Sequence, residues 1–259
     1  LLAREKNPGT TWNGFAATVD ALLGDDPKAG MQAVLGAFAE GASALAVSQA
    51  LCYAAALRIA RFHTSNEFPD WITVLHTFTY CNALHRLLQR VSGPESTAAL
   101  ARGILAGAMA TYLDRFLNTP PQRLPDERSV RHEPEEADKL LDRLLELTNH
   151  KGEVETAAAT VYRYLLLGHD DRRLLQTLGD VLLREDAEFH SYQMFEAGVR
   201  QYHLLKRERP EAARHVLVAV ARYLAAHSPT DRAMTQTYTI AVRLHRGEEL
   251  YRETGGATS

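Results

Sequence analysis

Histidine is the residue type on which chemistry in this chain would depend, because 11 histidines are spread through 259 residues. Several lie in apolar stretches, and the clearest case is 68–88, FPDWITVLHTFTYCNALHRLL, which contains His76 and His85. A neutral imidazole can coordinate a metal ion or move a proton near pH 7. Histidines in apolar helical stretches therefore raise two hypotheses, a metal site and a site of acid–base catalysis.

In a helical projection of the segment around His76 and His85, the two histidines lie on nearly opposite faces. We favour His76 for a site, since Tyr80 follows one turn later and offers a hydroxyl on the same face. A hydrogen-bonded core histidine is the alternative for His76. His63 ends the preceding apolar stretch, so we expect it at the mouth of the same pocket. Its alternative role is to interact with the last carbonyls of its own helix.

A second cluster lies in 184–203, REDAEFHSYQMFEAGVRQYH. Asp186 and His190 are four residues apart, which places them on one face of a helix. A carboxylate one turn from a histidine commonly orients the imidazole and makes it more basic. The alternative is an ordinary exposed pair, with Phe189 in the core. His227 ends a further apolar stretch, where it is either part of a site or a C-terminal cap.

Known catalytic motifs are absent: the sequence has no HExxH, GxSxG, P-loop or GxGxxG pattern, and the paired ExxH helices of di-iron bundles are missing too. A single metal ion held mostly by imidazoles fits the residues better than a carboxylate-bridged pair. Imidazole is a good ligand for Fe, Zn, Cu and Ni, so ligand type leaves the metal open.

These residues must be positioned by helices, because no segment alternates apolar and polar residues as a strand would. Proline, glycine and acidic residues divide the chain into about eleven helices, and we predict an all-α fold, either a multi-helix bundle or stacked helical pairs. The chain is predicted to form a single domain (1–259), with a proline-rich loop near 118–133 joining two helical halves. The predicted helices are 12–23, 27–39, 42–62, 70–91, 94–117, 134–149, 153–167, 170–184, 186–207, 210–226 and 230–252.

Composition narrows the class of protein. The net charge of -3 argues against a nucleic-acid binder, which needs a basic surface. The longest uncharged run, 41–57, is short for a membrane span, and we expect a buried core helix there.

Two cysteines without a disulfide or CxxC pattern fit a reducing, cytoplasmic compartment. The extensive apolar stretches 42–62 and 94–117 also suggest a homodimer interface. The chain begins without Met, so a further domain of a longer protein is compatible with the sequence.

The segment 74–80, VLHTFTY, followed by CNAL, resembles the histidine-bearing helix of questin-oxidase-like proteins. These are all-helical, histidine-rich oxygenases, some iron-dependent, which act on polycyclic aromatic compounds. The stretch 58–85 also resembles helical segments beside Rieske iron–sulfur domains in some bacterial proteins. Only about thirty residues carry the likeness.

The resemblance implies that His76 is a metal ligand, with His63, His190 and His227 as candidates for the other ligands. Neither cysteine stands in a CxH or CxxH context, so the chain holds no Rieske cluster of its own. Electrons would then come from a redox partner, a cosubstrate or the substrate.

The leading hypothesis is thus a metal-dependent oxygenase, with non-haem iron bound by these histidines and Asp186 orienting His190. Tyr80 and Phe189 would line the pocket for a small organic, in some cases aromatic, substrate. A non-catalytic helical interaction module is the alternative, and it predicts scattered histidines. A metal-free enzyme with Asp186 and His190 as a general base is the third hypothesis.

Overall fold

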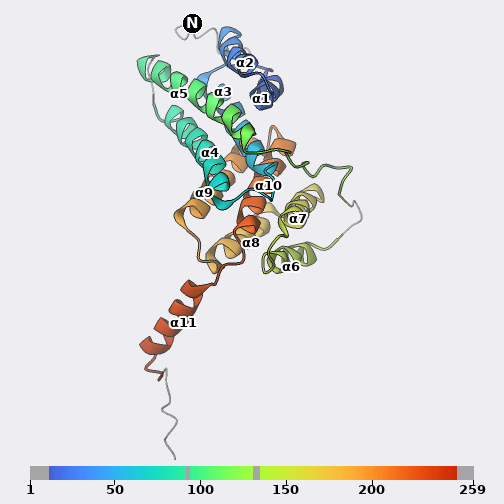
Figure 1. The fold of residues 1–259 in the computed structure, drawn as a ribbon, viewed down its shortest axis with the longest axis vertical. Helices are drawn as coiled ribbons and strands as arrows, with labels where there is room; N and C mark the ends of the chain where they lie inside the picture. The colour runs from blue at the N-terminus through green and yellow to red at the C-terminus, as the bar shows by residue number, and fades with distance from the viewer. Residues whose placement is uncertain (1–11, 92–93, 131–134, 250–259) are drawn as a thin grey trace, which may run out of the picture.

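The computed structural model describes residues 12–91, 94–130 and 135–249, and all regular structure in these ranges is helical. The predicted all-α fold of eleven helices is confirmed (Figure 1). The helices are α1 (Phe15–Leu23), α2 (Pro27–Ala39), α3 (Ala44–Ala60), α4 (Phe68–Leu88), α5 (Pro94–Leu113), α6 (Ala137–Leu147), α7 (Val154–Leu166), α8 (Asp171–Arg184), α9 (Phe189–Leu205), α10 (Pro210–Ala226) and α11 (Ala233–His245), with a 3-10 turn η1 (Asp114–Phe116) after α5.

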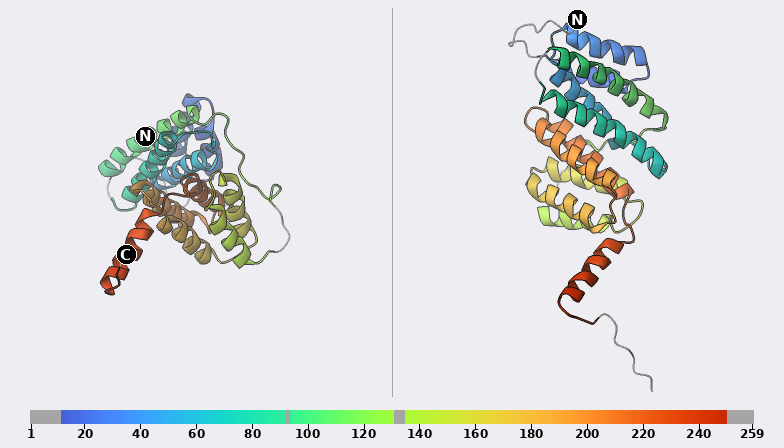
Figure 2. Two further views of the ribbon diagram at one scale, coloured as in Figure 1. Left: turned by 60° about the horizontal axis from the view of Figure 1, so that its bottom comes forward. Right: turned by 90° about the vertical axis from the view of Figure 1, so that its left-hand side faces the viewer.

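Helices α3 and α10 form the centre of the molecule. Each has 12 buried residues among its 17. Helix α3 packs against α1, α4 and α5, whereas α10 packs against α7 and α9 and also against α3. Alanine-rich faces allow this close approach because small side chains bring two helix axes together. The two halves of the chain therefore share one core, and Figure 2 shows their helices stacked in successive layers.

Local sequence signals explain where several helices begin. The Asp26 carboxylate accepts a hydrogen bond from the Lys28 N–H at 2.8 Å, and Pro27 stands at the first helical position of α2. Ser43 caps α3 in the same way through the Ala46 N–H. Glu67 and Asp70 form a capping box at the start of α4. These caps are short-range features, and the predicted starts at residues 27, 42 and 70 lie within two residues of the observed ones.

Some predicted boundaries are wrong. Helix α9 begins at Phe189 instead of residue 186, and α11 begins at Ala233 instead of residue 230. In both cases the preceding residues belong to a turn whose side chains bond to other parts of the chain. The predicted helix 134–149 is α6, from Ala137 to Leu147; residue 134 lies outside the described residues, as do 250–252.

The predicted core helix at 41–57 is confirmed, since α3 is almost entirely covered by the other helices. Within the described ranges, no helix is both long and apolar enough to cross a membrane. Most apolar residues of 42–62 are covered by other helices of the same chain, although Leu45 is exposed, and a dimer interface at 42–62 and 94–117 stays a prediction. Helix α5 retains exposed apolar side chains, including Leu113.

The predicted loop near 118–133 contains no helix in its described part, 118–130. It is tied to the corner between α3 and α4: the Gln122 N–H donates to the Arg61 carbonyl at 2.8 Å, and the Asn118 side chain accepts from the His63 N–H at 3.1 Å. The loop is therefore attached to the body of the molecule along its first part.

Candidate functional site

A pocket of about 470 Å³ lies where the N-terminal end of α4 meets the C-terminal end of α10. The turn before α7 and the turn between α8 and α9 complete its wall. Its aromatic residues are Phe68, Trp71 and Tyr223, and its imidazoles are His190 and His227. The pocket thus combines an apolar aromatic wall with titratable groups, as small-molecule sites commonly do.

His227 directly follows the last residue of α10 and is a half-buried titratable group of the pocket. Its Nδ1 lies 2.6 Å from the Tyr223 carbonyl oxygen, which can only accept, so Nδ1 carries the proton. Nε2 is then the unprotonated nitrogen, and it is buried without a hydrogen-bond partner. Burial lowers the pKa of His227. The residue is therefore a neutral imidazole with a free lone pair.

Aromatic rings fix the orientation of the His227 ring. Its centroid lies 5.1 Å from that of Phe68, 6.0 Å from Trp71 and 4.2 Å from Tyr223. The Nδ1 atom of His227 caps α10, as one alternative predicted, and its Nε2 atom is available to the pocket, as the other predicted. The two alternatives therefore coexist in one side chain.

His190, in the first turn of α9, is the second imidazole of the pocket. Its Nδ1 is buried without a hydrogen bond and lies 3.6 Å from the Glu188 Oε2 atom. The His190 ring centroid lies 5.2 Å from that of His76, on α4. His76 itself is exposed and does not line the pocket. The structure thus places these two predicted ligands side by side, and only His190 faces the pocket.

Asn66 is a pocket residue that the sequence analysis missed. Its Nδ2 is the third buried side-chain nitrogen in this pocket without a hydrogen-bond partner. The polar run at 64–67 before α4 was the available indication. Neighbouring His63 does not line the pocket: its Nδ1 bonds to the Ser65 hydroxyl at 2.6 Å and accepts from the Ser65 N–H at 3.1 Å.

Asp186 does not pair with His190, and this prediction needs correction. Because α9 begins only at Phe189, the two residues are not one helical turn apart. The Asp186 carboxylate accepts hydrogen bonds from the N–H groups of Ala233 (2.9 Å) and Met234 (2.8 Å) at the start of α11. These bonds lower the pKa of Asp186. Asp186 is therefore an N-terminal cap supplied from a distant turn.

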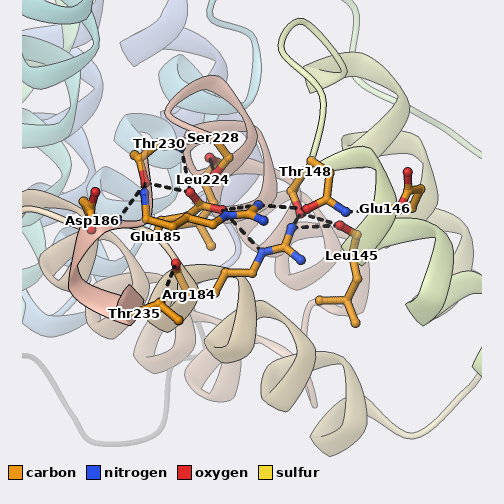
Figure 3. A network of polar contacts seen from close by, with 12 residues as sticks. Leu145, Glu146, Thr148, Arg184, Glu185, Asp186, Leu224, Ser228, Thr230 and Thr235 are labelled. Carbon is orange, nitrogen blue, oxygen red and sulfur yellow. Dashed lines mark hydrogen bonds and ion pairs between the residues drawn. The ribbon is translucent and has the colours of Figure 1, made fainter. Parts of the chain in front are cut away.

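Glu185, next to Asp186, holds the segment that follows His227. Its carboxylate accepts from the Thr230 N–H at 2.7 Å and from the Thr230 hydroxyl at 2.8 Å, and it pairs with Arg232 at 2.8 Å (Figure 3). These partners lower the pKa of Glu185 against the opposing effect of burial. Although Glu185 and Asp186 line the pocket, their carboxylates are already engaged in structural bonds.

The two other residues predicted to line the substrate pocket lie outside it. Tyr80 is exposed on α4 and its hydroxyl donates to the Gly103 carbonyl at 3.1 Å. Phe189 is also largely exposed, with its ring 3.8 Å from that of His190. Both residues are close to the histidines in the sequence, but their side chains do not line the pocket.

His85 illustrates the structural role that histidines take elsewhere in this fold. It is buried, and its Nδ1 lies 2.8 Å from the Ser48 hydroxyl, which itself donates to the Leu45 carbonyl. Burial lowers the pKa of His85 to about 4. Its bonds join α3 to α4, and it has no place in the pocket.

The predicted four-histidine metal centre is not assembled as such. His190 and His227 line one pocket, whereas His63 and His76 do not. In the part of the chain that the structure describes, no group of three or more His, Cys, Asp or Glu residues is arranged to hold a metal ion. The residues present therefore do not fit a resident metal in this arrangement.

Comparisons with known proteins identify no relative. No protein-family model matches the chain, and neither the curated proteins nor the solved structures contain a significant match. The resemblance to questin-oxidase-like proteins thus stays a prediction, and the pocket itself carries the functional argument.

Proposed function

We propose that the pocket binds a small organic molecule with a planar ring and a hydroxyl or enol group, and that His227 acts on it as a base. The observation that carries this proposal is the group of three buried nitrogens without a partner: Asn66 Nδ2, His190 Nδ1 and His227 Nε2. Buried polar atoms are rarely left unpaired in folded proteins, because each one costs free energy. A polar ligand in the pocket would supply the partners.

The chemistry of each group suggests its role. Burial lowers the pKa of His227, so its ring is neutral, and because Tyr223 holds the proton on Nδ1 the unprotonated Nε2 can accept the proton of an acidic ligand hydroxyl. The Asn66 amide can donate a hydrogen bond to a ligand oxygen. The rings of Phe68 and Trp71 can stack on or edge against a planar ligand. In this proposal His227 is the general base, instead of the predicted Asp186 and His190.

A ligand-observed NMR screen of phenols, hydroxyquinones and enols tests the proposal. We expect the screen to identify ligands that bind the His227→Gln variant about tenfold more weakly than the wild type. This is the effect of losing one hydrogen bond to a buried group. His203→Gln is the matched control, since His203 is exposed on α9 away from the pocket. A screen in which no ligand distinguishes the two variants would contradict the proposal. It would favour the non-catalytic interaction module.

The metal-dependent oxygenase is the second proposal. It is supported by the short distance between the His76 and His190 rings and by the shared pocket of His190 and His227. Because these residues do not form a complete ligand set, the oxygenase would need further ligands and a source of electrons. Elemental mass spectrometry of untagged protein from iron-supplemented medium tests it. A content of about one iron per chain that is lost in His190→Ala would support this proposal. Absence of iron after anaerobic reconstitution would contradict it.

A further inference from the structure

Helix α11 stands apart from the helical body. None of its residues is buried, and Figures 1 and 2 show it projecting beyond the stacked helices. A helix of 13 residues is only marginally stable alone in water. Its side chains are nevertheless sorted into two faces, which indicates a partner that the single chain does not provide.

The two faces follow from a projection at about 100° per residue. Met234, Tyr238, Ala241 and Leu244 fall on one mainly apolar side, which also holds Thr237 and His245, and Ile240 and Val242 lie at its edges. The opposite side carries Gln236, Thr239 and Arg243. Tyr238 is 71% exposed and Met234 is 61% exposed, although both are large apolar residues. An apolar side this exposed is typical of an interaction surface.

The base of α11 is held firmly, so the helix is presented in a defined direction. Asp186 caps its first turn, and Arg232 pairs with Glu185 and donates to the Asn149 side chain at 2.8 Å. The Thr235 hydroxyl donates to the Arg184 carbonyl at 3.4 Å (Figure 3). These bonds attach α11 to the turn between α8 and α9.

The helix ends on either side of this turn expose further apolar side chains. Leu183, beside Arg184, is 67% exposed, and Phe189, at the start of α9, is 63% exposed. The apolar side of α11 and this corner of the body together expose roughly 700 Å² of large apolar side chains, at about 200 Å² for a full residue. A stable interface needs about 800 Å² from each partner. Helix α11 alone falls well short of that area.

We propose that this surface is occupied by a second copy of the chain, with the two α11 helices antiparallel about a two-fold axis. In this arrangement the tip of each α11 reaches the Leu183 and Phe189 corner of the other copy, so helix and corner are covered together. A two-fold contact uses the same surface on both copies, so each chain contributes its α11 and its corner, roughly 700 Å² of large apolar side chains, close to the area that a stable interface needs. The C-terminal end of α11 and the residues that follow it carry two arginines, Arg243 and Arg246, and two glutamates, Glu248 and Glu249. Their charges cancel, so no net charge opposes the contact.

Light scattering and sedimentation of the full chain under reducing conditions test the proposal. We expect a dimer whose dissociation constant rises at least tenfold in Tyr238→Glu. Gln236→Glu is the matched control, because it adds the same charge on the opposite side of α11 and leaves the dimer intact. Neither change touches a buried residue, so both variants keep the folded body, which circular dichroism checks. A monomeric wild-type chain, or equal effects of both substitutions, would overturn the proposal.

Cysteine cross-linking tests the antiparallel order. Cys52 and Cys81 are buried, so a cysteine introduced on α11 can be oxidised selectively. We expect Tyr238→Cys, near the middle of the helix, to form a disulfide between copies. Leu244→Cys, at the tip, stays unlinked because the two tips lie at opposite ends of the pair. Efficient linking at Leu244 would show a parallel contact and overturn the arrangement.

Discussion

At the scale of single residues, the protonation state of His227 distinguishes it from the other histidines that line or approach the pocket. Its Nδ1–H is committed to the Tyr223 carbonyl, and burial disfavours the charged ring. We expect the pKa of His227, followed by the NMR shifts of its ring during a pH titration, to lie below the usual value near 6.5. An Nε2–H tautomer or a pKa above that value would remove His227 as the base of the pocket.

Asp114, in η1, provides a second prediction because its carboxyl is buried. Thr77 donates to one oxygen at 3.3 Å, the other oxygen has no hydrogen bond, and burial raises the pKa from 3.8 to about 6. A carboxyl with a raised pKa favours the folded state when protonated. The stability it contributes is full below pH 4 and is lost as the pH rises through 6.

Asp114→Asn should therefore be more stable than the wild type at pH 7, by about 3 kcal/mol, with little difference at pH 4. Urea unfolding at the two pH values measures this change. Asp180→Asn, at an exposed position on α8, is the control and should give no such pH dependence. Arg58, on α3, is the positive charge that lowers the pKa of Asp114. If the wild type is instead more stable than Asp114→Asn at pH 7, Arg58 compensates the buried charge.

At the scale of elements, the start of α11 depends on a residue from another part of the chain. Asp186→Ala removes the acceptor of two N–H groups, and we expect α11 to lose about 1 kcal/mol of local stability. Hydrogen exchange should become faster in the α11 amides and unchanged in α10, because α10 is held by packing. Asp26→Ala, which uncaps α2, is the comparison and should leave α11 unaffected. Equal exchange in α11 with and without Asp186 would contradict the capping role.

At the scale of the whole molecule, a buried arginine joins the two halves of the chain. Arg222 of α10 is fully buried, pairs with Glu155 of α7 at 2.6 Å, and donates to the Phe62 carbonyl after α3 at 2.6 Å. Arg222→Ala leaves these groups without partners and opens a cavity, so unfolding should become easier by about 3 kcal/mol or more. Arg200→Ala, which removes an exposed pair with Glu196, should cost under about 0.5 kcal/mol. Similar losses in the two variants would show that Arg222 is not a structural link.

The sequence by itself determined the helices and much of the core. Periodic apolar residues and caps such as Asp26 and Ser43 act over a few residues, so they can be recognised without knowing the fold. The same local rules identified His227 at the end of an apolar helix and His190 four residues from Asp186. They failed at Asp186, because its hydrogen-bond partners lie 47 and 48 residues away in the chain.

Only the tertiary structure decided which histidines meet. His190 and His227 come from helices that are distant in sequence, and the packing of α9 and α10 with the start of α4 brings them to one pocket while His63 and His76 stay outside. Asn66 became a candidate because burial left its amide without a partner, which no local pattern encodes. Helix type follows from short-range energetics, whereas a site depends on long-range packing and on which polar atoms that packing leaves unpaired.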